Sequence, residues 1–368
     1  MNRVPTTDSL PGGSTQSAPL IDESIFESED ADDWGNFVDS DEEPDVEFAC
    51  KHINLYPKRF CYLISISDII VERDVALKMM LGSPDDRNCQ MQSEIISIAK
   101  DLTYLLLYHR TFLLPSPHGQ HRVFVFPPPQ GPNLRNYPPR KAPIATRMLF
   151  VVQLLKALKA LHEAEIVHAD LNTANIMYTL RPLNNIVSEK YKQSGWKDGE
   201  LVMPMKPKEE LIGDSIVLGD FGLAHKAGTS TQKMQSPATY CAPERVHNIN
   251  PSYGSDIWSY MCIFFELYTG TYLFQGWSHA SVVSSIVHAL GPLPESWKGT
   301  YHVGGSGEDK WYDKNWQMDP ESYLKERITQ LRPDVGAREL ELVLSILRRG
   351  LVYQHENRIT AAELLDHD

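Results

Sequence analysis

Residues 166–175 read IVHADLNTAN and follow a segment, 145–162, whose apolar residues recur every three or four positions. That spacing predicts an amphipathic helix, so residues 166–175 are expected to form a loop directly behind it. Within the loop, Asp170 and Asn175 place a carboxylate and an amide five residues apart. The carboxylate can accept the proton of an attacking hydroxyl and the amide can bind magnesium, which is a spacing that suits phosphoryl transfer.

Farther along, residues 218–222 read LGDFG, a strand end followed by a second carboxylate, Asp220, and a flexible glycine. We expect Asp220 to hold the metal that bridges the phosphates. Lys78, in VALK (75–78), supplies an ammonium for the α and β phosphates, and Glu94 on the next helix its ion-pair partner. Each motif alone has a plainer interpretation. The H-x-D around Asp170 can occur by chance, and the LGDFG segment can be a turn that closes a strand. Lys78 can be a lysine of an edge strand and Glu94 part of a solvated helix face.

The net charge of -13 belongs to one end of the chain. Residues 1–50 hold fourteen Asp or Glu against the single Arg3, which leaves the remaining chain balanced at 34 against 34. Residues 1–45 are therefore expected to be a disordered acidic tail, in which Trp34 and Phe37 are either solvated or anchors for a partner. A balanced body argues against direct nucleic-acid binding, which needs a clustered basic face.

Five cysteines without paired C-x-x-C spacing predict reduced, structural thiols rather than a zinc or redox site. The sequence has no apolar signal region at its start and no uncharged apolar stretch of membrane-spanning length. We therefore expect no membrane partner and a location in the cytoplasm, the nucleus or both.

Hydrophobic patterning divides the chain into a β-rich first part and a mainly helical second part. Strand patterns cover 56–80 and 123–126, the latter ending at Pro127, and 90–108 is interpreted as a helix. Later helices are expected over 255–268, apolar nearly all round, and in the apolar repeat from Leu340 to Leu351. A polar stretch at about 181–214 breaks the pattern and predicts a surface insertion.

With these motifs in this order, residues 46–368 resemble the eukaryotic protein kinase fold. YCAPE (240–244) is similar to the end of the kinase activation segment, DIWS (256–259) to the buried central helix, and Arg358 to the arginine that pairs with Glu244. The resemblance implies an α+β fold of two lobes, an N-lobe at 46–126 and a C-lobe at 127–368. Since the chain ends close to where the kinase core usually finishes, little C-terminal appendage is expected.

The segment 246–297, with LGPLP at 290–294, and the insertion before Asp220 are more narrowly similar to fungal kinases related to the SR-protein kinases. This resemblance implies a serine/threonine kinase that uses ATP and Mg²⁺ and acts on protein substrates, with Ser/Arg-rich proteins as the suggested class. It also implies that Ala76 and Met177 sandwich the adenine and that Phe126 ends the strand entering the hinge.

Departures from the kinase pattern concern phosphate handling, adenine binding and regulation. No glycine occurs between Val46 and Lys78, so a glycine-rich phosphate loop cannot be assigned. Asn172 stands where most kinases have the catalytic-loop lysine, and Ala169 where they have an arginine that reads a phosphorylated activation loop. Prolines at 127–129 lack the N–H that usually donates to adenine, a role that Gln130 or Gly131 could take in a shifted register.

Three functions remain open at this stage. The leading hypothesis is a protein kinase with Asp170 as base, Asn172 beside the transferred phosphate, Asn175 and Asp220 on magnesium, and Lys78 with Glu94 on the phosphates. A pseudokinase scaffold is the alternative that the missing glycines and lysine favour. A small-molecule phosphotransferase of the aminoglycoside or choline type is disfavoured, because those enzymes lack the APE, DIWS and Arg358 features.

Overall fold

The computed structural model describes residues 76–80, 86–116, 119–127, 133–137, 142–180, 212–229, 237–303, 307–315 and 319–367. The predicted tail at 1–45, the strand-like run before Ala76, and Gln130 and Gly131 lie outside these residues. Among the described helices, none combines the length and the apolar character that a membrane crossing requires.

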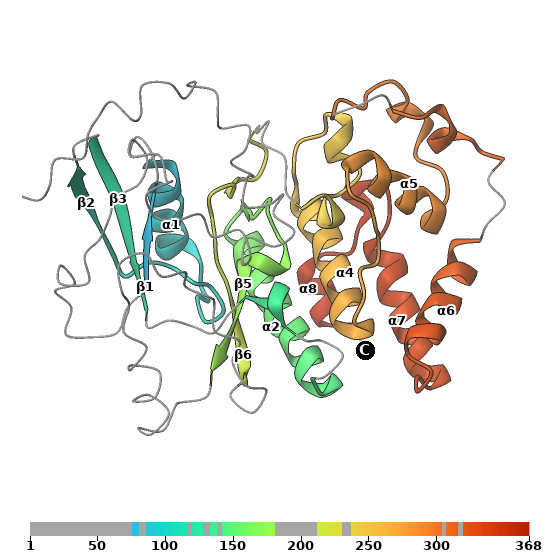
Figure 1. The fold of residues 1–368 in the computed structure, drawn as a ribbon, viewed down its shortest axis with the longest axis horizontal. Coiled ribbons are helices and arrows are strands. Elements are labelled where there is room, and N and C mark those ends of the chain that lie inside the picture. Colours follow the sequence, from blue (N-terminus) through green and yellow to red (C-terminus); the bar gives the residue numbers. More distant parts are fainter. Residues whose placement is uncertain are drawn as a thin grey trace, which may run out of the picture. The chain divides into compact units, whose positions relative to one another are not determined.

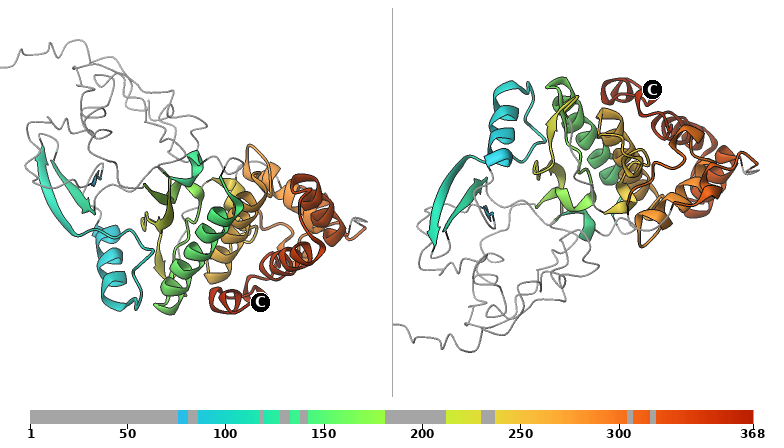
Figure 2. Two further views of the ribbon diagram at one scale, coloured as in Figure 1. Left: turned by 90° about the horizontal axis from the view of Figure 1, so that it is seen from below. Right: turned by 90° about the horizontal axis from the view of Figure 1, so that it is seen from above.

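The described strands are β1 (Ala76–Met79), β2 (Arg110–Ser116), β3 (Gly119–Phe126), β4 (Ile166–Val167), β5 (Ile176–Leu180), β6 (Ile212–Leu218) and β7 (His225–Lys226). The helices are α1 (Asp86–Ile98), α2 (Ile144–Glu163), α4 (Tyr253–Thr269), α5 (His279–Leu290), α6 (Pro320–Leu331), α7 (Ala337–Gly350) and α8 (Ala361–Leu365). The β1–β3–β2 sheet and α1 lie on one side of the β5–β6 pair and α4 to α8 on the other (Figure 1), as the views in Figure 2 repeat. This arrangement confirms the predicted α+β fold.

Strand β3 is the centre of the first sheet, with β1 and β2 paired antiparallel on its two sides. Its residues Val123, Phe124 and Val125 are all buried. Lys78 of β1 lies opposite Phe124. The predicted strand is confirmed, and it ends at Phe126 because the following proline has no N–H to continue the ladder.

The predicted helix over 90–108 is correct in its first half and wrong in its second. Helix α1 ends at Ile98, and the Asp101 carboxylate then accepts the N–H of Thr103 at 2.9 Å in a turn. The leucines that follow run beside β6, where Leu106 donates its N–H to the Leu218 carbonyl at 2.7 Å. A short apolar run fits a helix face and a buried extended segment equally well, so its pattern could not separate the two.

Helices α2 and α4 pack together at the centre of the helical part. Both were predicted, and α4 is buried nearly all round, with Trp258 and Phe265 fully enclosed. A capping box of Ser252 and Ser255 begins α4. Its end is set by Gly270, whose φ of 79° is a left-handed conformation that glycine adopts without a side-chain clash.

The β5–β6 pair lies against α2 through the side chain of Gln153. Its amide nitrogen donates to the Asp214 carbonyl at 2.9 Å, and its amide oxygen accepts the N–H of Ile216 at 2.8 Å. The predicted insertion at 181–214 therefore ends too late, because Ile212 already pairs with Leu180 of β5. Residues 181–211 lie outside the described part of the chain.

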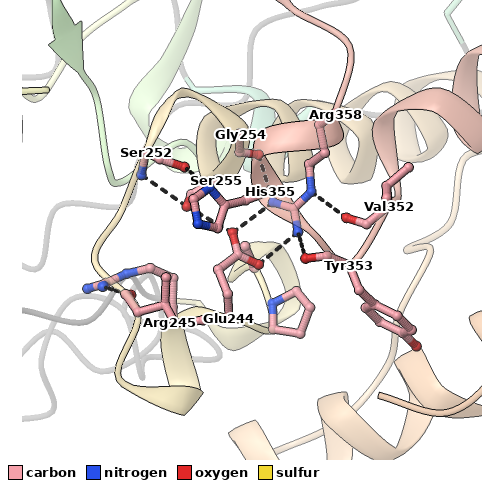
Figure 3. Close-up of polar contacts among 12 residues, drawn as sticks. Glu244, Arg245, Ser252, Gly254, Ser255, Val352, Tyr353, His355 and Arg358 are labelled. Atoms are coloured by element: carbon pink, nitrogen blue, oxygen red, sulfur yellow. Dashed lines mark hydrogen bonds and ion pairs between the residues drawn. The ribbon is translucent and has the colours of Figure 1, made fainter. Parts of the chain in front are cut away.

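A buried ion pair joins the segment before α4 to the segment before α8, as predicted (Figure 3). Arg358 binds Glu244 through two N–O contacts of 2.7 and 2.8 Å, with neither side chain exposed. Ser255 donates to the same carboxylate at 3.0 Å. Burial alone would raise the pKa of Glu244, but the Arg358 charge and hydrogen bonds outweigh it and hold that pKa below its ordinary value.

Candidate active site

The side-chain carboxylate of Asp256, in α4, holds the backbone of the loop at 166–175. Asp256, almost fully buried, accepts the backbone N–H of His168 at 2.8 Å and of Ala169 at 2.9 Å. Ala169 has a φ of 62°, a left-handed conformation that costs free energy for a residue with a side chain and that these two bonds help to hold. Burial works to raise the pKa of Asp256, but the hydrogen bond and charge of His162 lower it below its ordinary value.

The Asp170 carboxylate is held by two side-chain amides from its own loop. Asn172 donates to one of its oxygens at 3.2 Å, and Asn175 donates to the other at 2.8 Å. Asn175 also donates to the Asp170 carbonyl at 2.9 Å, and Asn172 accepts the N–H of Ala174 at 2.9 Å. The structure therefore brings the predicted Asp170, Asn172 and Asn175 together and orients the carboxylate within the loop.

The side-chain amide of Asn175 has two ends, and its contacts with Asp170 use the nitrogen. Because its nitrogen is committed to Asp170, its oxygen is the atom that can serve a cation. Hard oxygen ligands of this kind suit Mg²⁺, which uses few protein ligands beside phosphate oxygens. Among the described residues, no group of three or more His, Cys, Asp or Glu side chains is placed to hold a metal ion.

Asp220 enters the site from the end of β6. The Gly219 N–H donates to the Asn175 carbonyl at 2.8 Å, and the Gly219 carbonyl contacts His168 at 3.0 Å, so the two predicted metal residues are carried by directly bonded segments. His168 is fully buried, and burial lowers its pKa, which keeps the ring neutral. Asp220 itself has a φ of 56° and a half-exposed side chain.

Lys78 lies in the site, but its predicted partner does not. Its ammonium lies 2.9 Å from the Asp220 carboxylate, whereas Glu94 pairs with Lys226 of β7 at 2.5 Å. The expected Lys78–Glu94 ion pair is therefore a wrong prediction for this conformation. The reason lies in the buried face of α1, which is formed by Asn88, Gln92 and Ile95.

Glu94 precedes Ile95 directly, so it points about 100° away from that buried face of the helix. Lys226, in β7, lies beside Glu94 on that side of the helix. The buried face is partly polar, since Gln92 donates to Asn88 at 2.7 Å and accepts the N–H of Tyr108 at 3.2 Å. Which residues of α1 turn inward could not be predicted, because the apolar periodicity of this helix is weak.

The surroundings of the predicted adenine position contain a polar atom that the sequence did not single out. Ala76 lies opposite Phe126 in the sheet, and Met177 lies in β5, where Asn133 forms an antiparallel bridge with it. The Asn133 side-chain oxygen is buried and has no hydrogen-bond partner among the described residues. A buried acceptor without a donor is costly, and the amino or hydroxyl groups of a nucleotide would satisfy it.

Gly219 lies close to Met177, because a Cβ atom at Gly219 would lie 3.2 Å from the Met177 methyl group. The residues present thus fit a nucleotide: a buried acceptor at Asn133, an ammonium at Lys78, and oxygen ligands at Asn175 and Asp220. Asn133 follows the proline-rich run by a few residues, and an asparagine at such a turn carries little signal in sequence alone.

The fold and the arrangement of this site are those of the protein kinase class, and the family comparison agrees. A model of the protein kinase domain matches residues 71–368, so the chain belongs to the protein kinase family. It is similar to serine/threonine-protein kinase AFC3 of Arabidopsis thaliana, 28% identical over 64% of this chain and 60% of that protein. It is also similar to dual specificity protein kinase CLK2 of Homo sapiens and lkh1 of Schizosaccharomyces pombe, each 27% identical over 63% of this chain. The chain spans 44% and 32% of the lengths of those two relatives.

Proposed function

We propose that this chain is a serine/threonine protein kinase that transfers the γ-phosphate of ATP to hydroxyl groups of proteins. The observation that carries the proposal is the orientation of the Asp170 carboxylate by Asn172 and Asn175, together with the backbone bond from Gly219 to Asn175 that joins the Asp220 segment to this loop. This set supplies a proton acceptor and two metal-binding groups on bonded backbone segments.

In this proposal Asp170 accepts the proton of the substrate hydroxyl while the two asparagine amides keep its oxygens in place. Mg-ATP, when bound, supplies the phosphoryl group and the cation that neutralises its charge. Asn175 would bind the cation through its amide oxygen and Asp220 through its carboxylate. Asn172 is buried and neutral where most kinases have a lysine, so no positive charge from this position stabilises the transition state and we expect slow turnover.

Lys78 has to exchange partners for this chemistry. Its contact with Asp220 occupies a carboxylate that the cation would need. Negative phosphate oxygens attract the ammonium, and the cation attracts Asp220, so binding of Mg-ATP would replace one ion pair by two favourable contacts. Half-exposed side chains on both partners keep the cost of that exchange low.

For the substrate we propose Ser/Arg-rich proteins. Support comes from the resemblance of residues 246–297 to kinases related to the SR-protein kinases. The charge balance of residues 51–368 supports action without direct nucleic-acid contact, and the location we propose is the cytoplasm, the nucleus or both.

A pseudokinase scaffold is the second candidate, and the ion pairs favour it. With Lys78 on Asp220 and Glu94 on Lys226, the ammonium expected on the phosphates and the carboxylate expected to pair with it are both engaged elsewhere. In that case the kinase fold would serve protein binding, and Mg-ATP would bind weakly or not at all.

The deciding experiment is a thermal-shift titration with Mg-ATP on the wild type, Asp220→Ala and Asp309→Ala, the last an exposed carboxylate far along the chain that serves as control. The proposal expects a magnesium-dependent rise in melting temperature, absent in Asp220→Ala and kept in Asp309→Ala. Phosphate transfer to an Arg/Ser repeat peptide, lost in Asp170→Asn, then separates the kinase from the scaffold. Transfer to small alcohols alone would point instead to a small-molecule phosphotransferase.

A further inference from the structure

A hydrogen-bonded chain connects the catalytic loop to the buried helix α4. The Tyr240 hydroxyl lies 2.8 Å from the Thr173 hydroxyl and 2.7 Å from a carboxylate oxygen of Glu266. Thr173 belongs to the catalytic loop, between Asn172 and Asn175, and Glu266 to α4. Thr173 and Tyr240 are each 3% exposed, so water does not compete for these bonds.

The direction of the chain follows from the chemistry of its members. An ionised carboxylate only accepts, so the Tyr240 hydroxyl donates to Glu266. Its oxygen must then accept from Thr173, which makes Thr173 the first donor. Burial raises the pKa of Tyr240, with the Glu266 charge acting the same way, so the phenol stays neutral and keeps its proton.

Tyr240 is itself held rigidly. Its carbonyl accepts the Ser259 hydroxyl at 2.8 Å, and its ring packs edge-on against Tyr272 at 6.3 Å between centroids. The tyrosine is thus joined to α4 through both its backbone and its side chain. The Thr173 hydroxyl, which contacts the Tyr240 hydroxyl, is therefore held in place relative to α4.

We propose that Thr173 and Tyr240 are positioning residues, which hold the catalytic loop on α4 so that Asn172 and Asn175 can orient Asp170. Asp256 fixes the front of the loop at His168 and Ala169, and the Thr173–Tyr240–Glu266 chain fixes its far end. This inference rests on the proposed kinase function for its effect on turnover, but its structural part concerns the loop alone.

The cleanest variant is Thr173→Val, which removes one hydroxyl and leaves the Tyr240–Glu266 bond in place. Thr173→Ser keeps the hydroxyl and serves as the conservative rescue. Tyr240→Phe removes both bonds, and Tyr260→Phe is its matched control, because the Tyr260 hydroxyl is equally buried in α4 but donates to the Val151 carbonyl at 3.3 Å, away from the loop.

We expect Thr173→Val and Tyr240→Phe to lower kcat about five- to tenfold with little change in the KM for ATP, as the loss of one oriented hydrogen bond predicts. The double variant Thr173→Val with Tyr240→Phe should be no slower than Tyr240→Phe alone, because both substitutions remove the same Thr173–Tyr240 hydrogen bond. Thr173→Ser and Tyr260→Phe should keep wild-type kcat even where Tyr260→Phe loses stability. Equal losses of kcat in Tyr240→Phe and Tyr260→Phe would overturn the inference.

A pH profile adds a readout that general destabilisation would not move. Burial raises the pKa of Glu266 to about 7, while Tyr240, Tyr272 and Cys262, the titratable neighbours, have pKa values raised by burial and stay neutral. Below that value Glu266 loses the charge that strengthens the chain. The ratio of wild-type to Thr173→Val kcat should therefore grow as the pH rises from 6 to 8, whereas a flat ratio would count against the chain.

Amide hydrogen exchange tests the loop without using activity. Exchange at the Asn175 and Gly219 amides, both hydrogen-bonded in the loop region, should accelerate several-fold in Thr173→Val and Tyr240→Phe but not in Tyr260→Phe. If the wild type shows no Asp170-dependent turnover, the kinase function fails while faster exchange still supports the link. Unchanged exchange in both loop variants would overturn the inference whatever the enzyme does.

Discussion

The ammonium of Lys78 lies 2.9 Å from the carboxylate of Asp220, while the residue expected beside it, Glu94, pairs with Lys226 instead. Nucleotide binding would need Lys78 free to contact phosphate and Asp220 free to contact the cation, whereas here these two residues pair with each other. Both pairs are partly exposed, so solvent screens them and each contributes little to stability. Such an arrangement can be exchanged by a ligand or by a single substitution.

Lys226→Ala should favour the exchange. Removing Lys226 frees Glu94 without touching Lys78 or Asp220, so the form with Lys78 available to phosphate becomes more populated. We expect the Kd for Mg-ATP, measured by calorimetry, to fall up to about fivefold, the equivalent of one exposed ion pair. Lys159→Ala breaks a comparable exposed pair with Glu163 and should leave the Kd unchanged. Weaker binding in Lys226→Ala would show that the Glu94 pair supports the site.

Arg358→Met should destabilise the protein far more than the loss of an exposed arginine. Glu244 would be left buried and charged without its cationic partner, a cost of about 3–5 kcal/mol in the free energy of unfolding. Arg348→Met, which breaks an exposed pair with Glu321, is the matched control and should cost less than about 1 kcal/mol. Urea denaturation measures both. Similar losses in the two variants would mean that the buried pair is worth no more than a surface contact.

The scaffold of the protein was readable in sequence because its residues act locally or in fixed motifs. Asp170 and Asn175 are five residues apart on one loop, so their contact follows once the loop forms. The Glu244–Arg358 pair spans more than a hundred residues but followed from the family resemblance. Helix α4 followed from its continuous apolar character.

What the sequence could not supply depends on the rotation of α1 and on long-range contacts. The side of α1 that turns inward is polar at Asn88 and Gln92, so hydrophobic spacing did not predict that Glu94 faces Lys226. The buried acceptor at Asn133 depends on a bridge to β5. The role of Asp256 as the anchor of His168 and Ala169 needed the fold, since helix position alone marks it only as part of the scaffold.

Glu266→Gln should stabilise the protein at neutral and alkaline pH. The pKa of Glu266 is raised by burial from 4.5 to about 7, so the native state binds this proton more tightly than the unfolded state does. Its contribution to stability is therefore complete below pH 4.5 and is lost as the pH rises to about 7. Relative to the wild type, the Glu266→Gln variant should gain melting temperature from pH 5 to pH 8. A constant difference across that range would show that Glu266 titrates normally.

Asn172→Ala should slow catalysis more than it weakens nucleotide binding. Asn172 is buried and connects Asp170 to the N–H of Ala174, so its loss frees one carboxylate oxygen and one backbone donor of the loop. Asn175 would still hold the other oxygen of Asp170, which should keep kcat measurable but about tenfold lower. Because the Asn172 amide is engaged with Asp170 and Ala174 inside the loop, the Kd for Mg-ATP should stay within about twofold of the wild type. Single-turnover phosphate transfer, with Kd from calorimetry, separates the two effects. A parallel loss of binding and turnover would instead show that Asn172 shapes the nucleotide site as a whole.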